Sequence, residues 1–365
     1  MKIQRASFAP YALPFVVPIP SADGPQTERH GWLVRLLDGE GRAGYGDAAH
    51  WPGFGANADT VAADLRRLVS SSSQLASMQF EKAGDIRSWF SQQRVSSPAA
   101  YAIELALLDL LAQRAGRSLA RMLTATPLDC VPVHALVFDG PSAHAAAQHG
   151  VRAVKIKVGR APLHVDDARL AEIRAATGPA MRLRVDANGA WSRDDARRAL
   201  TLLARHDIEL FEQPVAADDI EGLAWLRRET GARIAADESL SQRRDLDALL
   251  AANAIDVAVV KPMFAGGVQA SLDLITRARG AGIEVIVTHA LESAVGRCGA
   301  AHVAAAIGDP TLVHGLTRVV AEDVADLPEV RDGCLPLPQG AGLGVAPLLE
   351  DDDDDAEKDN EEARP

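Results

Sequence analysis

The chain of 365 residues contains few cysteines and few aromatic residues, and it has no long apolar run. No apolar stretch approaches the roughly 20 residues that a transmembrane helix needs, so no membrane partner or span is expected. The three cysteines, Cys130, Cys298 and Cys334, are scattered without a CxxC spacing. This excludes a zinc site built from cysteines and fits a reducing cytoplasm. The N-terminus also lacks the pattern of a signal peptide, so a cytoplasmic location is expected.

The charge pattern excludes a further class of partner. The formal net charge is −12, and residues 350–365 carry ten acidic and two basic side chains. The rest of the chain is therefore only mildly acidic and has no basic stripe, so we expect no nucleic-acid partner. Residues 350–365 have almost no apolar surface to bury and are predicted to be a disordered acidic tail.

Residues 1–128 mix strand and helix patterns and predict the N-terminal part of an α+β capping domain. A strand over 32–37 is followed by a turn at 38–41 and a return strand from 43. Helices are expected near 57–70, 79–91 and 98–115. The last of these has Ser97 as its predicted N-cap, with Pro98 at the first helical position.

Residues 129–318 repeat a regular unit. Short β-branched runs recur about every 26 residues, and segments with helical spacing lie between them. Eight strands alternating with seven helices favour a modified TIM barrel of the (β/α)7β type, with an open doubly wound sheet as the alternative. Residues 319–349 are expected to return and complete the capping domain. The expected strands are 131–137, 153–158, 182–186, 209–212, 233–237, 257–261, 284–288 and 312–316.

Three carboxylates follow neighbouring strands of this barrel. Asp186, Glu212 and Asp237 each stand at the end of an apolar run. The carboxyl ends of barrel strands share one face, so these groups are expected to converge and to need a compensating cation. All-oxygen ligands favour a hard ion, Mg²⁺ or Mn²⁺. The alternative is that each acid caps the helix that follows it.

Lysine is scarce: the 38 basic residues include only six lysines. Three of these lie at predicted strand ends, Lys155 and Lys157 on the second strand and Lys261 on the sixth. Alternation along the strand places Lys155 and Lys157 on one face. A lysine close to a divalent ion and to another lysine has a lowered pKa and can act as a base, whereas the alternative is a structural ion pair.

These groups suit one class of reaction. A small carboxylate substrate would bind the metal, and a lysine would remove the proton α to that carboxylate. The metal would stabilise the enediolate that results. The sequence therefore predicts a metal-dependent enzyme for a carboxylate substrate.

The ordered set of strand-end motifs resembles the enolase superfamily, and within it the muconate-lactonizing subgroup. The resemblance covers nearly the whole chain and is greatest to the o-succinylbenzoate synthases. The motifs are KxK at 155–157, DxN at 186–188, EQP at 212–214, DES at 237–239 and KP at 261–262. Supporting segments are RVDANGAW at 184–191, RETG at 228–231, LESAVG at 291–296 and PGF at 52–54.

The resemblance implies a lyase that converts 2-succinyl-6-hydroxy-2,4-cyclohexadiene-1-carboxylate to o-succinylbenzoate by syn-dehydration in menaquinone biosynthesis. Lys157 would be the base and then the acid for the leaving water, and Lys261 would stabilise the enediolate. Asp186, Glu212 and Asp237 would hold Mg²⁺. The groups expected to orient them are Lys155, Asn188 and Glu238. The expected substrate contacts are Arg184, Trp51, Phe54, His289 and Ser293.

Some features leave alternatives open. His289 follows the seventh strand, where many synthases carry small hydroxyl residues, and is either a substrate contact or a histidine with satisfied hydrogen bonds. The Asp-x-Asp of dipeptide epimerases near the eighth strand is absent, because His-Gly-Leu-Thr stands at 314–317. An N-acylamino acid racemase, or another racemase or cycloisomerase of the subgroup, stays open, as do a non-catalytic scaffold and a monomeric or homo-oligomeric state. The segments 21–30 and 48–57 are predicted to close over the barrel mouth.

Overall fold

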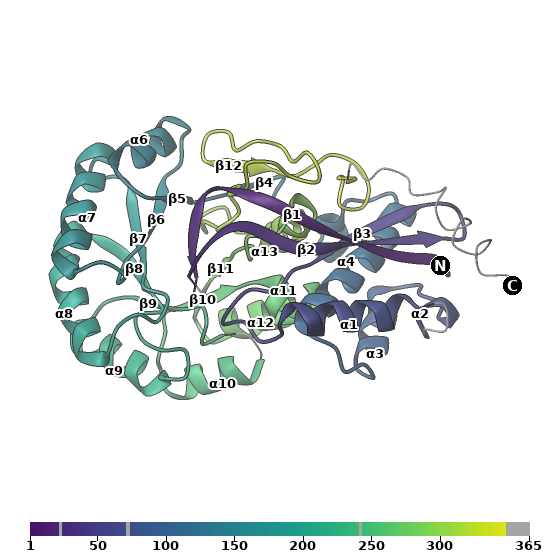
Figure 1. The fold of residues 1–365 in the computed structure, drawn as a ribbon, viewed down its shortest axis with the longest axis horizontal. Coiled ribbons are helices and arrows are strands. Elements are labelled where there is room, and N and C mark those ends of the chain that lie inside the picture. Colours follow the sequence, from purple (N-terminus) through teal and green to yellow (C-terminus); the bar gives the residue numbers. More distant parts are fainter. Residues whose placement is uncertain (22–23, 71–73, 241–242, 348–365) are drawn as a thin grey trace, which may run out of the picture.

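The computed structural model describes residues 1–21, 24–70, 74–240 and 243–347. A long antiparallel sheet with its helices lies beside a curved parallel sheet that helices wrap on the outside (Figure 1). The acidic tail predicted at 350–365 lies outside the described residues. Within the described segments, no helix combines the length and the apolar character needed to cross a bilayer.

The antiparallel sheet has the order β1-β2-β3. The predicted hairpin is confirmed, because β2 pairs with β3 across the turn at 39–42. The long first strand was not predicted, since four prolines interrupt its apolar pattern. Proline is tolerated there because β1 is an edge strand, which needs no ladder bonds on its outer side. The strands are β1 (Ile3–Ser21), β2 (Gly24–Asp38) and β3 (Ala43–Ala48).

Helix α4 (Ser97–Arg114) packs against this sheet and is buried along most of its length. Its N-cap is Ser96, one residue earlier than predicted, and Pro98 is its second residue. Gly44 and Gly46 of β3 face it so closely that an added Cβ on Gly46 would overlap the carbonyl oxygen of Ala102. The other helices of this region are α1 (Ala58–Val69), α2 (Gln74–Ser77), α3 (Ala83–Phe90) and α5 (Leu119–Leu123).

The parallel sheet has the order β11-β10-β9-β8-β7-β6-β5, so each strand lies beside its neighbour in sequence. Parallel bridges join His314 to Val133 and Gly315 to Thr288, which places the chain at 314–315 between the two edges of the sheet. This arrangement confirms the modified TIM barrel over the open sheet. The strands are β5 (Ala135–Val137), β6 (Ala153–Lys157), β7 (Arg182–Asp186), β8 (Ile208–Glu212), β9 (Ile234–Ala236), β10 (Val257–Val260) and β11 (Glu284–Val287).

Two predicted strands differ from the structure. The eighth forms only isolated bridges, and the first, at 131–137, is divided. Its beginning is β4 (Cys130–Pro132), which pairs antiparallel with β12 (Cys334–Pro336). A disulfide joins Cys130 to Cys334 across this pair, whereas Cys298 is free and buried. The sequence spacing did not predict the bond, because the two cysteines are 204 residues apart.

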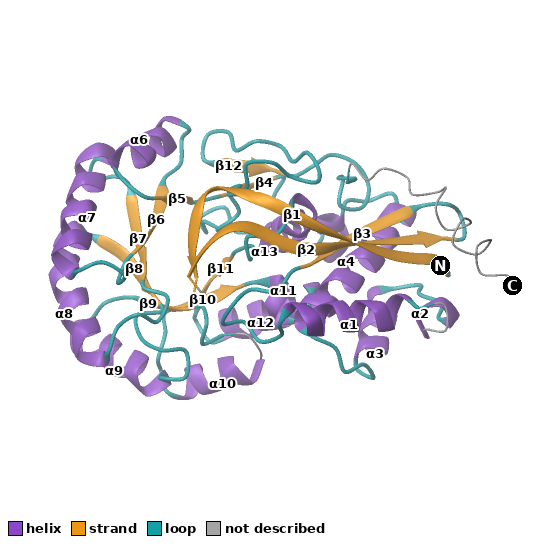
Figure 2. Cartoon of the chain, viewed as in Figure 1, coloured by secondary structure: helices purple, strands orange, loops and turns teal. Residues whose placement is uncertain are grey.

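Helices cover the outside of the parallel sheet, as Figure 2 shows. The segments with helical spacing that were expected between the barrel strands are helices in the structure. The helices are α6 (Gly140–Gln148), α7 (Leu163–Thr177), α8 (Arg193–Leu203), the 3-10 turn η1 (Ala204–His206), α9 (Ile220–Thr230), α10 (Arg243–Ala251), α11 (Pro262–Ala265), α12 (Val268–Gly280) and α13 (Ala294–Ile307).

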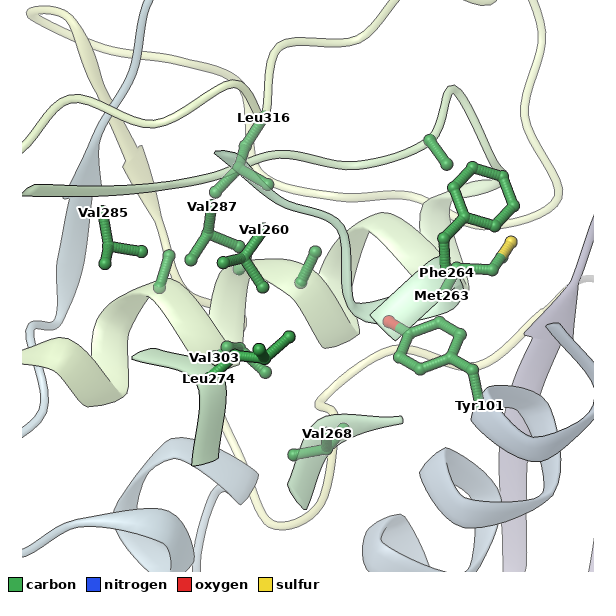
Figure 3. Close-up of a cluster of buried hydrophobic side chains, with 14 of the residues drawn as sticks. Tyr101, Val260, Met263, Phe264, Val268, Leu274, Val285, Val287, Val303 and Leu316 are labelled. Atoms are coloured by element: carbon green, nitrogen blue, oxygen red, sulfur yellow. The ribbon is translucent and has the colours of Figure 1, made fainter. Parts of the chain in front are cut away.

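The two regions share one core. Figure 3 shows Tyr101 of α4 among apolar side chains of the barrel, near Met263 and Phe264. The Tyr101 hydroxyl donates a hydrogen bond to the carbonyl of Gly296 in α13 at 2.7 Å. Residues 319–347 run back along the N-terminal region (Figure 1), where the carbonyl of Val319 accepts from the amide of Val16. The N-terminal region is therefore a fixed part of the barrel's surroundings.

We predict that Gly46→Ala destabilises the protein. The added methyl group would overlap the backbone of α4, and overpacking of a buried contact lowers stability by about 1–3 kcal/mol. Urea unfolding of the variant and the wild type measures the difference. Gly84→Ala is the matched control, because a Cβ there meets no atom closer than 3.9 Å. Equal midpoints for Gly46→Ala and the wild type would contradict the close packing of β3 on α4.

Candidate active site

A cavity of about 320 Å³ opens at the carboxyl ends of the barrel strands. Its wall includes Lys157 from the end of β6, Asp186 from the end of β7 and Lys261, which directly follows β10. The volume is that of a site for a small ligand. The loop at 51–54 contributes to the wall from the N-terminal region.

The three predicted carboxylates lie side by side at this end of the barrel. Asp186 and Glu212 are the last residues of β7 and β8 and are paired in register, and Asp237 directly follows β9. All three side chains are buried. The parallel register of neighbouring strands thus brings together residues that are about 25 positions apart in the sequence.

Two lysines neutralise these carboxylates. Lys155 Nζ lies 2.8 Å from Asp186 Oδ2 and 2.6 Å from Glu212 Oε1. Lys261 Nζ lies 2.6 Å from Asp237 Oδ1 and 2.5 Å from Oδ2. Burial alone would lower the pKa of Lys155, but the adjacent Asp186 and Glu212 raise it above its usual value.

The carboxylates differ in their surroundings. Burial, together with the charge of Asp186, raises the pKa of Glu212 to about 8. Burial acts on Asp186 too, but Lys155 and Lys157 outweigh it and lower its pKa. Glu212 therefore holds its negative charge less firmly than Asp186, and additional positive charge would stabilise all three anions.

Lys157 differs from the other two lysines. Burial lowers the pKa of its ammonium group, and the charges of Lys155 and Lys261 lower it further, against the opposing effect of Asp186. A lowered pKa makes the neutral amine accessible, which is the form that accepts a proton.

Asn188 and Glu238 join the same cluster. The Asn188 amide donates to Asp186 Oδ2 at 3.3 Å and to Glu238 Oε1 at 3.0 Å. Glu238 Oε2 is buried and has no hydrogen-bond partner within the described residues. Burial, with the charge of Asp237, raises the pKa of Glu238 to about 7. Glu238 is therefore another carboxylate that a nearby cation would stabilise.

The donor set fits a hard divalent ion. Three buried carboxylates from neighbouring strands supply oxygen ligands, and the orphaned Glu238 Oε2 lies in the same cluster. The described residues nevertheless include no ready cluster of three or more acidic, histidine or cysteine side chains arranged as metal ligands. The reason is visible in the geometry, since the ammonium groups of Lys155 and Lys261 pair with these carboxylates.

Trp51 and Phe54 both line the cavity, as does Ser21. The Phe54 ring stacks on Phe264 with centroids 4.6 Å apart, and Lys261 Nζ lies 4.1 Å from its centroid. The segment 21–30 is not a loop as predicted, because residues 24–30 belong to strand β2. Ala22 and Asp23 lie outside the described residues.

His289 lines the cavity and has both ring nitrogens engaged. Nδ1 accepts from the amide of Leu291 at 3.1 Å, so Nε2 carries the proton and donates to the carbonyl of Thr317 at 3.0 Å. Burial and the charge of Arg297 lower its pKa to about 3. His289 is therefore a neutral histidine with satisfied hydrogen bonds that lines the cavity.

Arg184 and Ser293 are not in the cavity wall. Arg184 lies two residues before Asp186 on β7, one layer deeper in the barrel, where Nε donates to Glu209 at 2.6 Å. Ser293 is buried, and its backbone amide donates to Asp47 at 3.0 Å. The hydrogen-bonding groups of both residues are thus engaged inside the protein.

Several residues of the site were missed by sequence reasoning. Gln213 accepts hydrogen bonds from the amides of Asp237 and Ser239, both at 3.1 Å, and so fixes the turn after β9. Its position in the EQP motif at 212–214 could have identified it as part of the site. Thr288 lines the cavity from the end of the predicted strand 284–288, which was the available signal, whereas Arg160 does so from a position that no periodic pattern marks.

Comparison with known proteins identifies the family. The family described as "Enolase C-terminal domain-like" matches residues 141–352. The hydrophobic dipeptide epimerase of Enterococcus faecalis is 31% identical over 325 residues, covering 87% of this chain and 88% of that protein. The o-succinylbenzoate synthase of Thermobifida fusca is 39% identical over 217 residues, or 57% of this chain and 67% of that protein.

Solved structures agree with this grouping. The muconate lactonizing enzyme of Pseudomonas fluorescens, complexed with muconolactone, superposes with a TM-score of 0.87 and 26% identity, covering 95% of this chain and 96% of that chain. The dipeptide epimerase of Cytophaga hutchinsonii, complexed with Mg and D-Ala-L-Val, gives a TM-score of 0.86 at 26% identity, covering 96% of this chain and 97% of that chain. The chain is thus an enzyme of the enolase superfamily, in its muconate-lactonizing subgroup.

Proposed function

We propose that the enzyme dehydrates 2-succinyl-6-hydroxy-2,4-cyclohexadiene-1-carboxylate to o-succinylbenzoate, a step toward menaquinone. The observation that supports abstraction of an α-proton is the pair of lysines in one cavity, with buried carboxylates between them. The choice of this substrate rests on the resemblance to the o-succinylbenzoate synthases and on the uncharged cavity wall near the eighth strand. Lys157 is the last residue of β6, and Lys261 directly follows β10. Three strands of the sheet, β7, β8 and β9, lie between these two. They would therefore approach a bound carboxylate from opposite faces.

The roles of the two lysines follow from their surroundings. Lys157, whose pKa is lowered, takes the proton from the carbon next to the substrate carboxylate and returns it to the departing hydroxyl. Lys261 pairs with Asp237 and stabilises the enediolate by its positive charge. A divalent ion such as Mg²⁺, held by Asp186, Glu212 and Asp237, would supply further positive charge at the substrate carboxylate.

The part of the cavity wall near the expected eighth strand favours a substrate without a free amino group. Gly315, Thr317 and Val319 line the cavity there, and none of them is charged. The Asp-x-Asp expected in dipeptide epimerases would place negative charge at this position. A neutral wall supports the lyase over a dipeptide epimerase, although relatives with both kinds of name are similar to this chain.

A racemase for N-acylamino acids is the second candidate. Such a substrate has no free amino group, so it fits the neutral wall equally well. It would also use one lysine on each face of the α-carbon, as Lys157 and Lys261 are placed. A spectroscopic assay with the cyclohexadiene carboxylate and Mg²⁺ tests the first candidate, and exchange of the α-proton of an N-acylamino acid in D₂O tests the second.

We predict that Asp186→Asn, Glu212→Gln and Asp237→Asn each weaken Mg²⁺ binding and abolish turnover. Each change removes one anionic ligand from a hard cation. Titration calorimetry with Mg²⁺ alone measures binding separately from activity. Glu229→Gln on the exposed surface of α9 is the control and should change neither quantity. A variant that binds Mg²⁺ as the wild type does would remove that residue from the ligand set.

We predict that substitutions of Lys157 and Lys261 differ in their effect on turnover. Lys157→Ala should lose proton transfer, with a drop in kcat of about 10²–10⁴-fold or more, because a general base contributes that much. Lys261→Arg keeps the positive charge but cannot act as a base, since arginine stays protonated in proteins. The lyase mechanism therefore predicts that Lys261→Arg dehydrates its substrate faster than Lys261→Ala.

The same two variants distinguish the racemase. If Lys261 must act as a base, both variants should lose exchange from one face of the α-carbon equally and completely. Full dehydration activity in Lys157→Ala would overturn the assignment of both lysines.

A further inference from the structure

Arg160 lines the catalytic cavity, and no step of the proposed reaction uses it. We infer that Arg160 binds the distal carboxylate, the one at the end of the succinyl tail of the substrate. This inference rests on the proposed function, whose substrate carries that second carboxylate, and it assigns the residue that binds it. It adds a residue that sets specificity at a distance from the reacting carbon.

The positive groups of the cavity have different partners. Lys155 pairs with Asp186 and Glu212, and Lys261 pairs with Asp237. Within the described segments, Arg160 makes one hydrogen bond, from Nη2 to the backbone carbonyl of Ser21 at 3.2 Å. A guanidinium has five N–H donors, and this neutral acceptor uses one of them. Among the described residues no second partner of the guanidinium is found, so it retains donors for an anion in the cavity.

The position of Arg160 relative to the catalytic lysine is fixed by the turn after β6. The carbonyl of Lys157 accepts a hydrogen bond from Arg169, and the amide of Gly159 donates to Asp166 Oδ2 at 2.7 Å. Gly159 has a φ of +84°, and a Cβ there would lie 3.0 Å from the Trp191 ring nitrogen. The backbone that leads from Lys157 to Arg160 is therefore held by two contacts with α7.

The sequence separation keeps Arg160 near the catalytic lysine. Three residues span at most about 11 Å, so the Cα of Arg160 lies within that distance of the Cα of Lys157. One carboxylate would bind at the reacting centre, and a tail of a few carbons would bring the second to the guanidinium. Two parallel N–H···O bonds from arginine to a carboxylate are stronger than the single bond to a carbonyl, so the ligand would compete well with Ser21.

A structural role is the alternative for Arg160. In that case the bond to Ser21 would only connect the end of β1 to the barrel, and the charge of the ligand tail would not matter. The two roles differ in a measurable way, because only the binding role makes the effect of an Arg160 substitution depend on the tail.

The test compares two ligands that differ only in the tail charge. o-Succinylbenzoate carries the distal carboxylate, and 2-butyrylbenzoate carries a methyl group in its place. Titration calorimetry in Mg²⁺ measures both dissociation constants for the wild type, Arg160→Met, Arg160→Lys and the surface control Arg198→Met. We expect the wild type and the control to prefer the succinyl ligand about tenfold, as one charge-assisted contact at a partly exposed site supplies.

Arg160→Met should bind both ligands equally, with an unchanged melting temperature, and Arg160→Lys should keep part of the preference. If Arg160→Met still preferred o-succinylbenzoate, the inference would be overturned, because another group would then bind the charged tail. Equal binding of the two ligands by the wild type would overturn it as well.

A second pair of probes separates this inference from the proposed function. N-Succinyl-L-phenylalanine and N-butyryl-L-phenylalanine carry the same two tails on an amino acid, and their α-proton exchange in D₂O reports on the racemase reaction. If the wild type fails to dehydrate the cyclohexadiene but exchanges the succinyl compound faster, and Arg160→Met loses that difference, the lyase function fails and the dicarboxylate inference stands. If the wild type dehydrates the cyclohexadiene but shows no difference between succinyl and butyryl compounds in binding or in proton exchange, the inference fails and the proposed function stands.

Discussion

Three carboxylates buried at neighbouring strand ends are the constraint on which the site depends. A buried carboxylate loses its hydration, so its charged form needs a nearby cation. Lys155 meets this need for Asp186 and Glu212, and Lys261 meets it for Asp237. Burial lowers the pKa of Lys157, and the ammonium charges of Lys155 and Lys261 in these pairs lower it further. The properties of the proposed base thus follow from how the neighbouring anions are neutralised.

The N-terminal region completes the site from the opposite side. The Phe54 ring lies against the ammonium group of Lys261 and also stacks on the ring of Phe264. Tyr101 reaches from α4 to Met263 and Phe264 of α11 (Figure 3), and its hydroxyl donates to the carbonyl of Gly296 in α13. Because the two regions share this core, the loop that carries Phe54 is held against the cavity by the packing of the whole molecule.

The sequence predicted the parts of the fold and site that have a regular period. The strand ends of the barrel, and with them Asp186, Glu212 and Asp237, follow from apolar runs that recur about every 26 residues. Strand β1 escaped prediction because its prolines are tolerated only at an edge, which is a tertiary property. The pairing of Cys130 with Cys334 depends on β12 returning across 204 residues. Arg184 was expected as a substrate contact from the resemblance alone, and the structure shows its guanidinium donating to Glu209 one layer below the cavity.

Specificity therefore has to come from groups outside the catalytic centre. A lyase and a racemase can both use the same lysines and carboxylates, so these residues do not distinguish the substrates. The neutral wall of Gly315, Thr317 and Val319 disfavours a ligand with a free ammonium group, since it offers no countercharge. Arg160 adds a positive group at the end of a fixed turn. A substrate with two carboxylates and no amine is the one that satisfies both ends of the cavity.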